Sequence, residues 1–235
     1  MTSVKLGVCA FALAVGALQA MGQSPAANVS DEYEPSNVEL LSQDVSNVKL
    51  GMAIDQVRAM TTNLFSISQE TARKDIETQV QEYAILEASE LLHGAGCVWP
   101  GWSTVRIWFT RPDIGGKACS ISFSKDLGAL PDMKALESRL VKKYGAWCRK
   151  KVTKQENGAL TYRFTWGAFD RQQGRFTGTG PTLDVWVHPS RVEKGEPVYR
   201  IAFDLNDPKL KGENQAAVDR AVEEVKIKAA QAIPF

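Results

Sequence analysis

The fold is decided by residues 104–125, which read TVRIWFT, RPDIGGK and ACSISFSK in succession. The first seven residues alternate between apolar and polar side chains, and the last eight alternate again, which is the period of a half-buried β-strand. The seven residues between them contain Pro, Asp and two Gly, a composition typical of a turn. The stretch therefore predicts an antiparallel hairpin with one apolar face.

The flanking sequence predicts further strands and helices. Pro131 and Asp132 suit the start of a helix and Gly145 suits its end, so we expect a helix over 132–144. Residues 66–92 are compatible either with strands or with a short helix. The other expected elements are a helix within 48–64, strands at 160–166, 183–187 and 199–205, and an amphipathic helix over 213–231.

These elements predict an α+β fold, an antiparallel sheet with helices packed on one face. We expect one such domain over 46–235, preceded by a flexible segment at 23–45. The order helix, strands, helix, strands is also compatible with two related helix-plus-sheet units, at 46–150 and 151–235.

Residues 1–22 have the pattern of a cleaved signal peptide. Lys5 supplies a positive charge, 6–18 is an uncharged run, and Leu18-Gln19-Ala20 ends in a small residue. The alternative is an uncleaved anchor, but the run is shorter than the roughly 20 apolar residues that span a bilayer. The pattern predicts a periplasmic or secreted protein of the cell envelope.

The charge balance argues against nucleic acid as a partner. The chain has 28 Lys and Arg against 27 Asp and Glu, and loss of Lys5 with the predicted signal leaves 27 of each. A basic excess, the usual footprint of nucleic-acid binding, is therefore missing. No later segment is long and apolar enough to predict a transmembrane helix.

Three cysteines, Cys97, Cys119 and Cys148, follow the predicted signal. The cysteines of an exported protein lie in an oxidising compartment, so one disulfide bond is expected. If the helix over 132–144 packs back across the hairpin, it carries Cys148 to the level of Cys119. This geometry predicts a Cys119–Cys148 disulfide.

The sequence contains no recognisable catalytic or metal-binding motif. Its two histidines, His93 and His188, lack metal-ligand spacing, and no nucleophile or phosphate-loop motif is present. We therefore expect no metal and no cofactor, and favour a protein that is not an enzyme. The alternative is an envelope hydrolase with a site in the loop 93–102 or 167–181.

The polar face of the predicted sheet is the candidate binding surface. Its strands place Trp and Arg side chains opposite the apolar face, a composition typical of binding hot spots. The alternative is that another part of the chain, such as the C-terminal helix, covers the tryptophans. The candidate binding residues are Arg106, Trp108, Arg163, Trp186, His188 and Arg200.

Two stretches resemble known envelope proteins. Leu50-Gly51-Met52, followed by Gln56-Val57 and Leu64, resembles the helix opening of SmpA/OmlA-type lipoproteins and of β-lactamase-inhibitor-like proteins. The stretch from 105–109 to Lys143-Tyr144-Gly145 is similar to an uncharacterised family of exported bacterial proteins. The resemblance implies helices on an antiparallel sheet whose open face binds an envelope protein. A structural module that binds lipid or cell wall is a further possibility.

Overall fold

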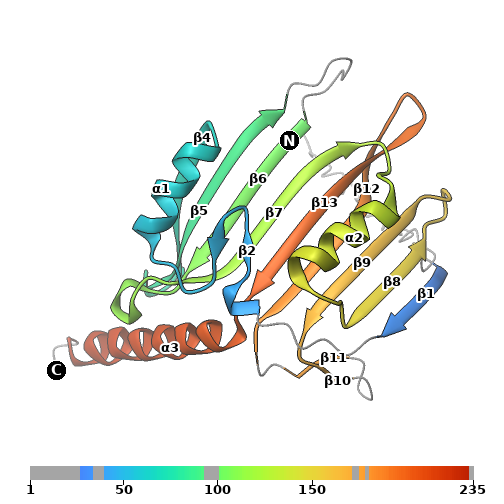
Figure 1. Ribbon diagram of the computed structural model, residues 1–235. Helices are drawn as coiled ribbons and strands as arrows, with labels where there is room; N and C mark the ends of the chain where they lie inside the picture. Colours follow the sequence, from blue (N-terminus) through green and yellow to red (C-terminus); the bar gives the residue numbers. More distant parts are fainter. Residues whose placement is uncertain (1–26, 34–39, 93–100, 171–174, 178–179, 233–235) are drawn as a thin grey trace, which may run out of the picture.

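The chain folds around one nine-stranded antiparallel sheet, in a computed structural model that describes residues 27–33, 40–92, 101–170, 175–177 and 180–232. The strand order is β1-β8-β9-β12-β13-β7-β6-β5-β4 (Figure 1). The sheet strands are β1 (Ala27–Tyr33), β4 (Ile67–Lys74), β5 (Gln81–Leu92), β6 (Gly101–Phe109), β7 (Ala118–Gly128), β8 (Arg149–Lys154), β9 (Leu160–Gly167), β12 (Thr182–Glu193) and β13 (Glu196–Asn206).

Three α-helices and two small hairpins complete the described structure. The helices are α1 (Ile54–Leu64), α2 (Met133–Tyr144) and α3 (Pro208–Gln231). The hairpins pair β2 (Asp44–Val45) with β3 (Val48–Lys49), and β10 (Phe169–Asp170) with β11 (Arg175–Phe176). Single 3-10 turns lie at Leu40–Ser42 and Pro112–Ile114. The predicted α+β class is confirmed.

The element order repeats once along the chain. Helix α1 is followed by β4 to β7, and α2 is followed by β8, β9, β12 and β13. The last strand of each set, β7 or β13, lies at the centre of the sheet, and the two strands pair antiparallel there. The sheet therefore consists of two helix-plus-four-strand sets joined along this central pair, with β1 added as a ninth strand beside β8.

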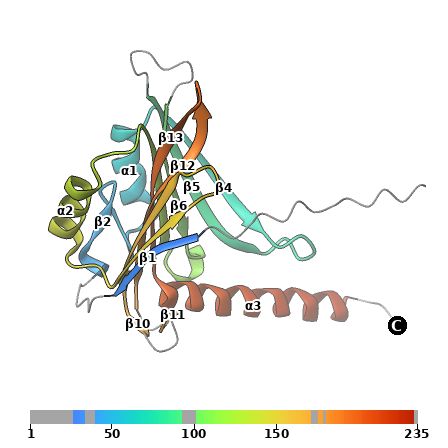
Figure 2. The same cartoon turned by 90° about the vertical axis from the view of Figure 1, so that its right-hand side faces the viewer.

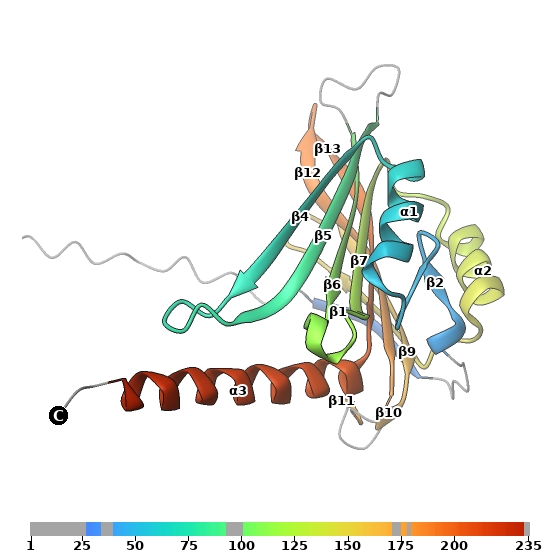
Figure 3. The same ribbon diagram turned by 90° about the vertical axis from the view of Figure 1, so that its left-hand side faces the viewer.

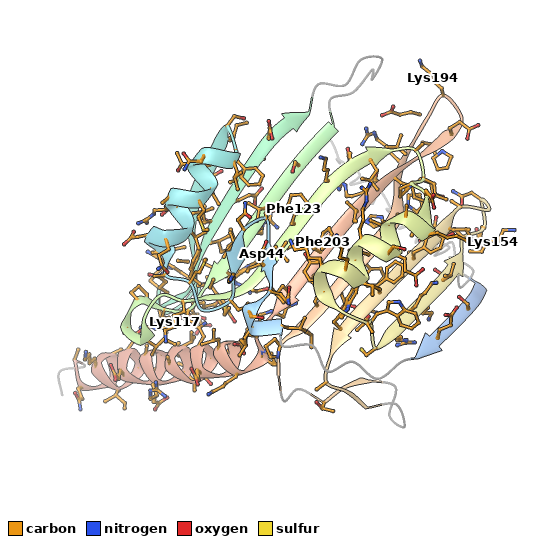
Figure 4. The ribbon with its side chains drawn as sticks, viewed as in Figure 1. Asp44, Lys117, Phe123, Lys154, Lys194 and Phe203 are labelled. Carbon is orange, nitrogen blue, oxygen red and sulfur yellow. The ribbon has the colours of Figure 1, made fainter. Side chains whose placement is uncertain are left out.

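Both α1 and α2 cover the same face of the sheet, with the β2–β3 hairpin between them (Figures 1 and 2). The buried side chains beneath them come from alternating strand positions, including Ile107, Phe109, Phe164, Trp166 and Leu205. On the central strands Phe123 stands opposite Phe203, with ring centroids 5.9 Å apart (Figure 4).

Local capping fixes the helix ends. The Asp132 carboxylate accepts hydrogen bonds from the backbone N–H groups of Lys134 and Ala135 at 2.9 and 3.2 Å, which confirms the predicted start of α2. Gly145 ends the same helix with a φ of +79°, a conformation that favours glycine. Asp207 caps α3 in the same way, so this helix starts earlier than predicted.

Helix α3 does not lie across the polar face. It runs beneath the ends of the strands and extends beyond the sheet (Figures 2 and 3). The buried Asn214 holds it there, because its amide oxygen accepts from the Arg111 backbone N–H at 2.7 Å and its NH₂ donates to the Glu82 carbonyl at 2.9 Å. The polar face therefore remains without a covering helix in the described part of the chain.

Other sequence predictions are resolved by the structure. The helix expected within 48–64 is confirmed as α1, which begins at Ile54, and the segment before it pairs with the start of β7: the Gly51 N–H donates to the Ala118 carbonyl at 2.8 Å. Residues 66–92 form two long strands, β4 and β5, and no helix. The strand β8 was not predicted at all.

The predicted Cys119–Cys148 disulfide is also wrong, since the two cysteines are not bonded to each other. Cys119 lies on β7, whereas the backbone N–H of Cys148 donates to the Thr165 carbonyl of β9 at 2.8 Å. Strands β12 and β13 lie between β9 and β7, and three strand spacings amount to roughly 14 Å. A disulfide needs Cα atoms within about 7 Å. Cys97 and His93 lie outside the described residues.

Candidate functional site

The pairing register places all six predicted binding residues on one face of the sheet, opposite the face that carries the helices. Trp186 pairs with Arg163 on β9 and His188 pairs with Arg200 on β13. Arg106 pairs with Ser122 and Trp108 with Ser120, both on β7. We call this surface the polar face. Trp108 and Trp186 are each partly exposed on it.

Arg163 and Trp186 form the tightest contact on the polar face. The guanidinium carbon of Arg163 lies 4.3 Å from the centroid of the Trp186 ring, well within cation–π distance. Asp184 holds the guanidinium with two hydrogen bonds, at 2.8 and 3.1 Å, and also accepts from the Thr165 hydroxyl at 2.7 Å. A planar cation is thus fixed over an aromatic ring in the folded protein.

Arg106 and Trp108 form a second, looser pair. The Arg106 guanidinium carbon lies 5.9 Å from the Trp108 ring, and its Nε donates to Glu87 at 2.7 Å. Both charged side chains of this ion pair are over two-fifths exposed. The arrangement repeats the chemistry of the first pair: an arginine that stacks on a tryptophan and is held by a carboxylate. We call the two arrangements the Arg–Trp stacks.

Arg200 belongs to an ion cluster with Asp126 and Arg191. Its Nε donates to Asp126 at 2.8 Å, and Arg191 donates to the other oxygen of the same carboxylate at 2.5 Å. The Asp126 side chain is only 4 % exposed. Burial by itself would raise the pKa of Asp126, but the hydrogen bonds from Arg191 and Arg200 outweigh it and lower that pKa. His188 is half-buried, and its Nδ1 lies 3.1 Å from the Pro189 carbonyl oxygen.

The two stacks are too far apart for one small ligand. They are separated laterally by three strand spacings, from β6 to β12, and by four residues along the strands. These offsets place the two tryptophans roughly 20 Å apart. Small side chains lie between them, including Ser122 and Ser124 of β7 and Ala202 of β13. The stretch between the stacks also carries Asp204 of β13, which stands opposite Ser122.

A pocket of about 380 Å³ opens at the end of the polar face nearest α3, beside Trp108. Its lining residues come from five strands and a helix: Arg73, Tyr83, Trp108, Ser120, Asp204, Asn206 and Lys211. Most of these were not predicted as site residues. Arg73 and Lys211 come from β4 and α3, and only the curvature of the sheet and the docking of α3 bring them together.

The described residues contain no group of three or more His, Cys, Asp or Glu side chains that would hold a metal ion. Burial raises the pKa of the Cys119 thiol to about 11, so this cysteine stays protonated at neutral pH and is a poor nucleophile. A larger pocket, of about 770 Å³, lies elsewhere, between the β12–β13 hairpin and the chain that leads into α2.

No helix among the described residues has the length and apolar character needed to cross a membrane. Comparison of the chain with protein-family models, with curated proteins and with solved structures gives no match.

Proposed function

We propose that this protein is an exported, non-enzymatic binding protein that captures an envelope protein on the polar face of its sheet. The observation that carries the proposal is the pair of Arg–Trp stacks, roughly 20 Å apart on a face without a covering helix. A protein interface of standard size covers about 800 Å² on each partner, and a patch of that area is wide enough to include both stacks. Trp and Arg are also the residues most enriched among interface hot spots.

The state of the stacks supports binding of a pre-formed protein surface. Each arginine of the stacks already has its carboxylate partner, so a partner protein meets two arginines whose charge is balanced and whose position is held. Fixed side chains lose less conformational entropy on binding. The small side chains of Ser122, Ser124 and Ala202 between the stacks leave room for a protruding loop of the partner.

The first test is the replacement of both Trp108 and Trp186 by Ala. The partner is first identified by capture on the wild-type protein from the native envelope and mass spectrometry, and is then purified for direct titration. Loss of two hot-spot aromatics is expected to weaken its binding at least about 100-fold. The control is Leu64→Ala, which removes an exposed apolar side chain of α1 on the opposite side of the sheet.

The control variant should bind like the wild type, and all variants should keep the wild-type circular dichroism spectrum. Unchanged affinity of a folded Trp108→Ala/Trp186→Ala protein would remove the polar face from the interface. The envelope-hydrolase alternative makes the opposite prediction, since activity in the loops 93–102 or 167–181 would survive loss of both tryptophans.

Export is tested by the N-terminus of the mature protein. We expect N-terminal sequencing of the protein from its native source to begin after Ala20 or slightly later, and the protein to appear in the periplasmic fraction or the medium. Deletion of the apolar run at 6–18 should retain the protein in the cytoplasm. An intact Met1 on protein recovered from the envelope would contradict cleavage.

A further inference from the structure

The pocket beside Trp108 has properties that the binding of a large partner does not explain. The sheet register arranges its lining residues in two adjoining rows. Trp108 pairs with Ser120 and Ser120 with Asn206, whereas Arg73 pairs with Tyr83 two residues further along β5, because Trp108 pairs with Ile85. In a flat sheet β4 and β13 would lie four strand spacings apart, roughly 19 Å. Residues from both strands line one pocket, so this end of the polar face is cupped.

Two opposite charges in the cup lack a charged partner. Among the described residues, none forms a hydrogen bond or ion pair with the carboxylate of Asp204, and none offers Lys211 a carboxylate within salt-bridge distance. The Lys211 ammonium instead donates to the Asn206 amide oxygen at 2.5 Å. The Ser120 hydroxyl also donates to this oxygen, at 2.6 Å.

The remaining lining groups add an auxiliary cation and an aromatic wall. Arg73 forms an ion pair with Glu82 at 2.8 Å, but its side chain is 69 % exposed, and exposed pairs of this kind contribute little stability. Tyr83 and Trp108 supply ring surface from β5 and β6. The volume of about 380 Å³ is at the lower end of the range for small-ligand sites.

We infer that this cup binds a small zwitterion with an apolar side chain, either a free α-amino acid or a dipeptide. Lys211, assisted by Arg73, binds the ligand carboxylate, and Asp204 binds its ammonium group. The apolar side chain lies against Tyr83 and Trp108. A ligand with only one of the two charges leaves the other protein charge without a partner, and charge-assisted hydrogen bonds are the strong ones. The inference goes beyond the proposed function and does not depend on a protein partner.

The test measures the binding of four leucine derivatives to the full chain by isothermal titration calorimetry. Free leucine and Leu-Leu carry both charges, whereas N-acetyl-leucine lacks the ammonium group and leucinamide lacks the carboxylate. The indole N–H signal of Trp108, assigned with the Trp108→Phe variant, reports whether a ligand reaches the cup. We expect at least one zwitterion to bind about tenfold or more tightly than the two singly charged probes. Comparison of leucine with Leu-Leu distinguishes the amino acid from the dipeptide.

Two charge-removing variants assign the roles of Lys211 and Asp204. Lys211→Met should weaken the preferred zwitterion about tenfold or more while leaving leucinamide unchanged, and Asp204→Asn should weaken the zwitterion while N-acetyl-leucine binds no worse. Lys209→Met, on the exposed side of the same helical turn, is the matched control and should bind like the wild type. Circular dichroism establishes that each variant is folded.

Equal binding of all four derivatives, or no shift of the Trp108 signal by any of them at about 10 mM, overturns the inference. A Lys209→Met effect as large as that of Lys211→Met overturns it as well. These outcomes are separate from those of the partner titration. Lys211→Met and Asp204→Asn leave both Arg–Trp stacks in place, and Trp186→Ala removes one stack without touching the cup, so these variants distinguish failure of one proposal from failure of the other.

Discussion

Replacement of Trp166 by Ala is expected to lower the free energy of unfolding by about 3–5 kcal/mol. Trp166 is fully buried on β9, beneath α2. Its ring lies 5.8 Å from that of Tyr144 and 6.4 Å from that of Phe164, and its indole N–H donates to the Gly145 carbonyl at 2.9 Å. The substitution therefore opens a cavity under the helix and removes the hydrogen bond that ties the end of α2 to the sheet.

Urea unfolding followed by circular dichroism measures this loss, and the melting temperature should fall by about 6–20 °C for a domain of this size. Trp166→Phe is the graded comparison, because it keeps most of the apolar volume and removes the hydrogen bond. It should lower the free energy of unfolding by about 1–2 kcal/mol. Trp186→Ala, on the polar face, should cost less than about 1.5 kcal/mol. A loss below about 1 kcal/mol for Trp166→Ala would show that α2 does not depend on this anchor.

The second large effect is expected at Asp126. Its buried carboxylate neutralises Arg191 and Arg200, so Asp126→Asn leaves Arg200 without an acceptor charge and leaves Arg191 with Glu193 alone. Removal of one partner from a buried ion pair costs about 3–5 kcal/mol, but the two arginines here are each about a third exposed. We therefore expect a smaller loss, of about 2 kcal/mol at neutral pH.

This contribution should depend on pH in one direction. The folded-state pKa of Asp126 is lower than its unfolded value, so its stabilisation is present above the unfolded pKa of about 3.9 and is lost as the pH falls through the folded-state pKa. The difference in unfolding free energy between wild type and Asp126→Asn should therefore shrink below about pH 4. Asp55→Asn is the exposed control, since that side chain is 83 % exposed and pairs with Arg58. A wild-type advantage that persists unchanged at low pH would contradict this account.

Much of the fold was predictable from local signals. The hairpin of β6 and β7 follows from alternation on both sides of a Pro- and Gly-containing turn, and α2 follows from its Asp132 cap and Gly145 stop. Strand β8 reads RKKVTK, which carries no alternating apolar pattern, and it is a strand because β9 and β1 pair with it on either side. Strand β4 is exposed along its whole length, so its sequence has no alternation of apolar and polar residues either.

For the candidate site, the sequence predicts which face of its strand each side chain lies on, but not which strands are neighbours. Alternation showed which side chains share a face, and for this reason Arg163 and Trp186 were correctly placed together. Strand order is a tertiary property, and without it the chain gave no reason to bring Arg73 and Lys211 beside Asp204. The disulfide prediction is wrong for the same reason, because it depended on an unknown strand order. The helix was expected to return along the hairpin, but α2 instead carries Cys148 sideways to β9.

The pairing of β7 with β13 has a mechanical consequence for the polar face. One Arg–Trp stack belongs to the first helix-plus-strand set and the other to the second, and a continuous ladder of backbone hydrogen bonds, with no flexible linker, sets the span between them. The distance between the two stacks is therefore fixed by the sheet. A ligand that engages both has to match a preset span, and it gains selectivity from that span without a closing motion of the protein.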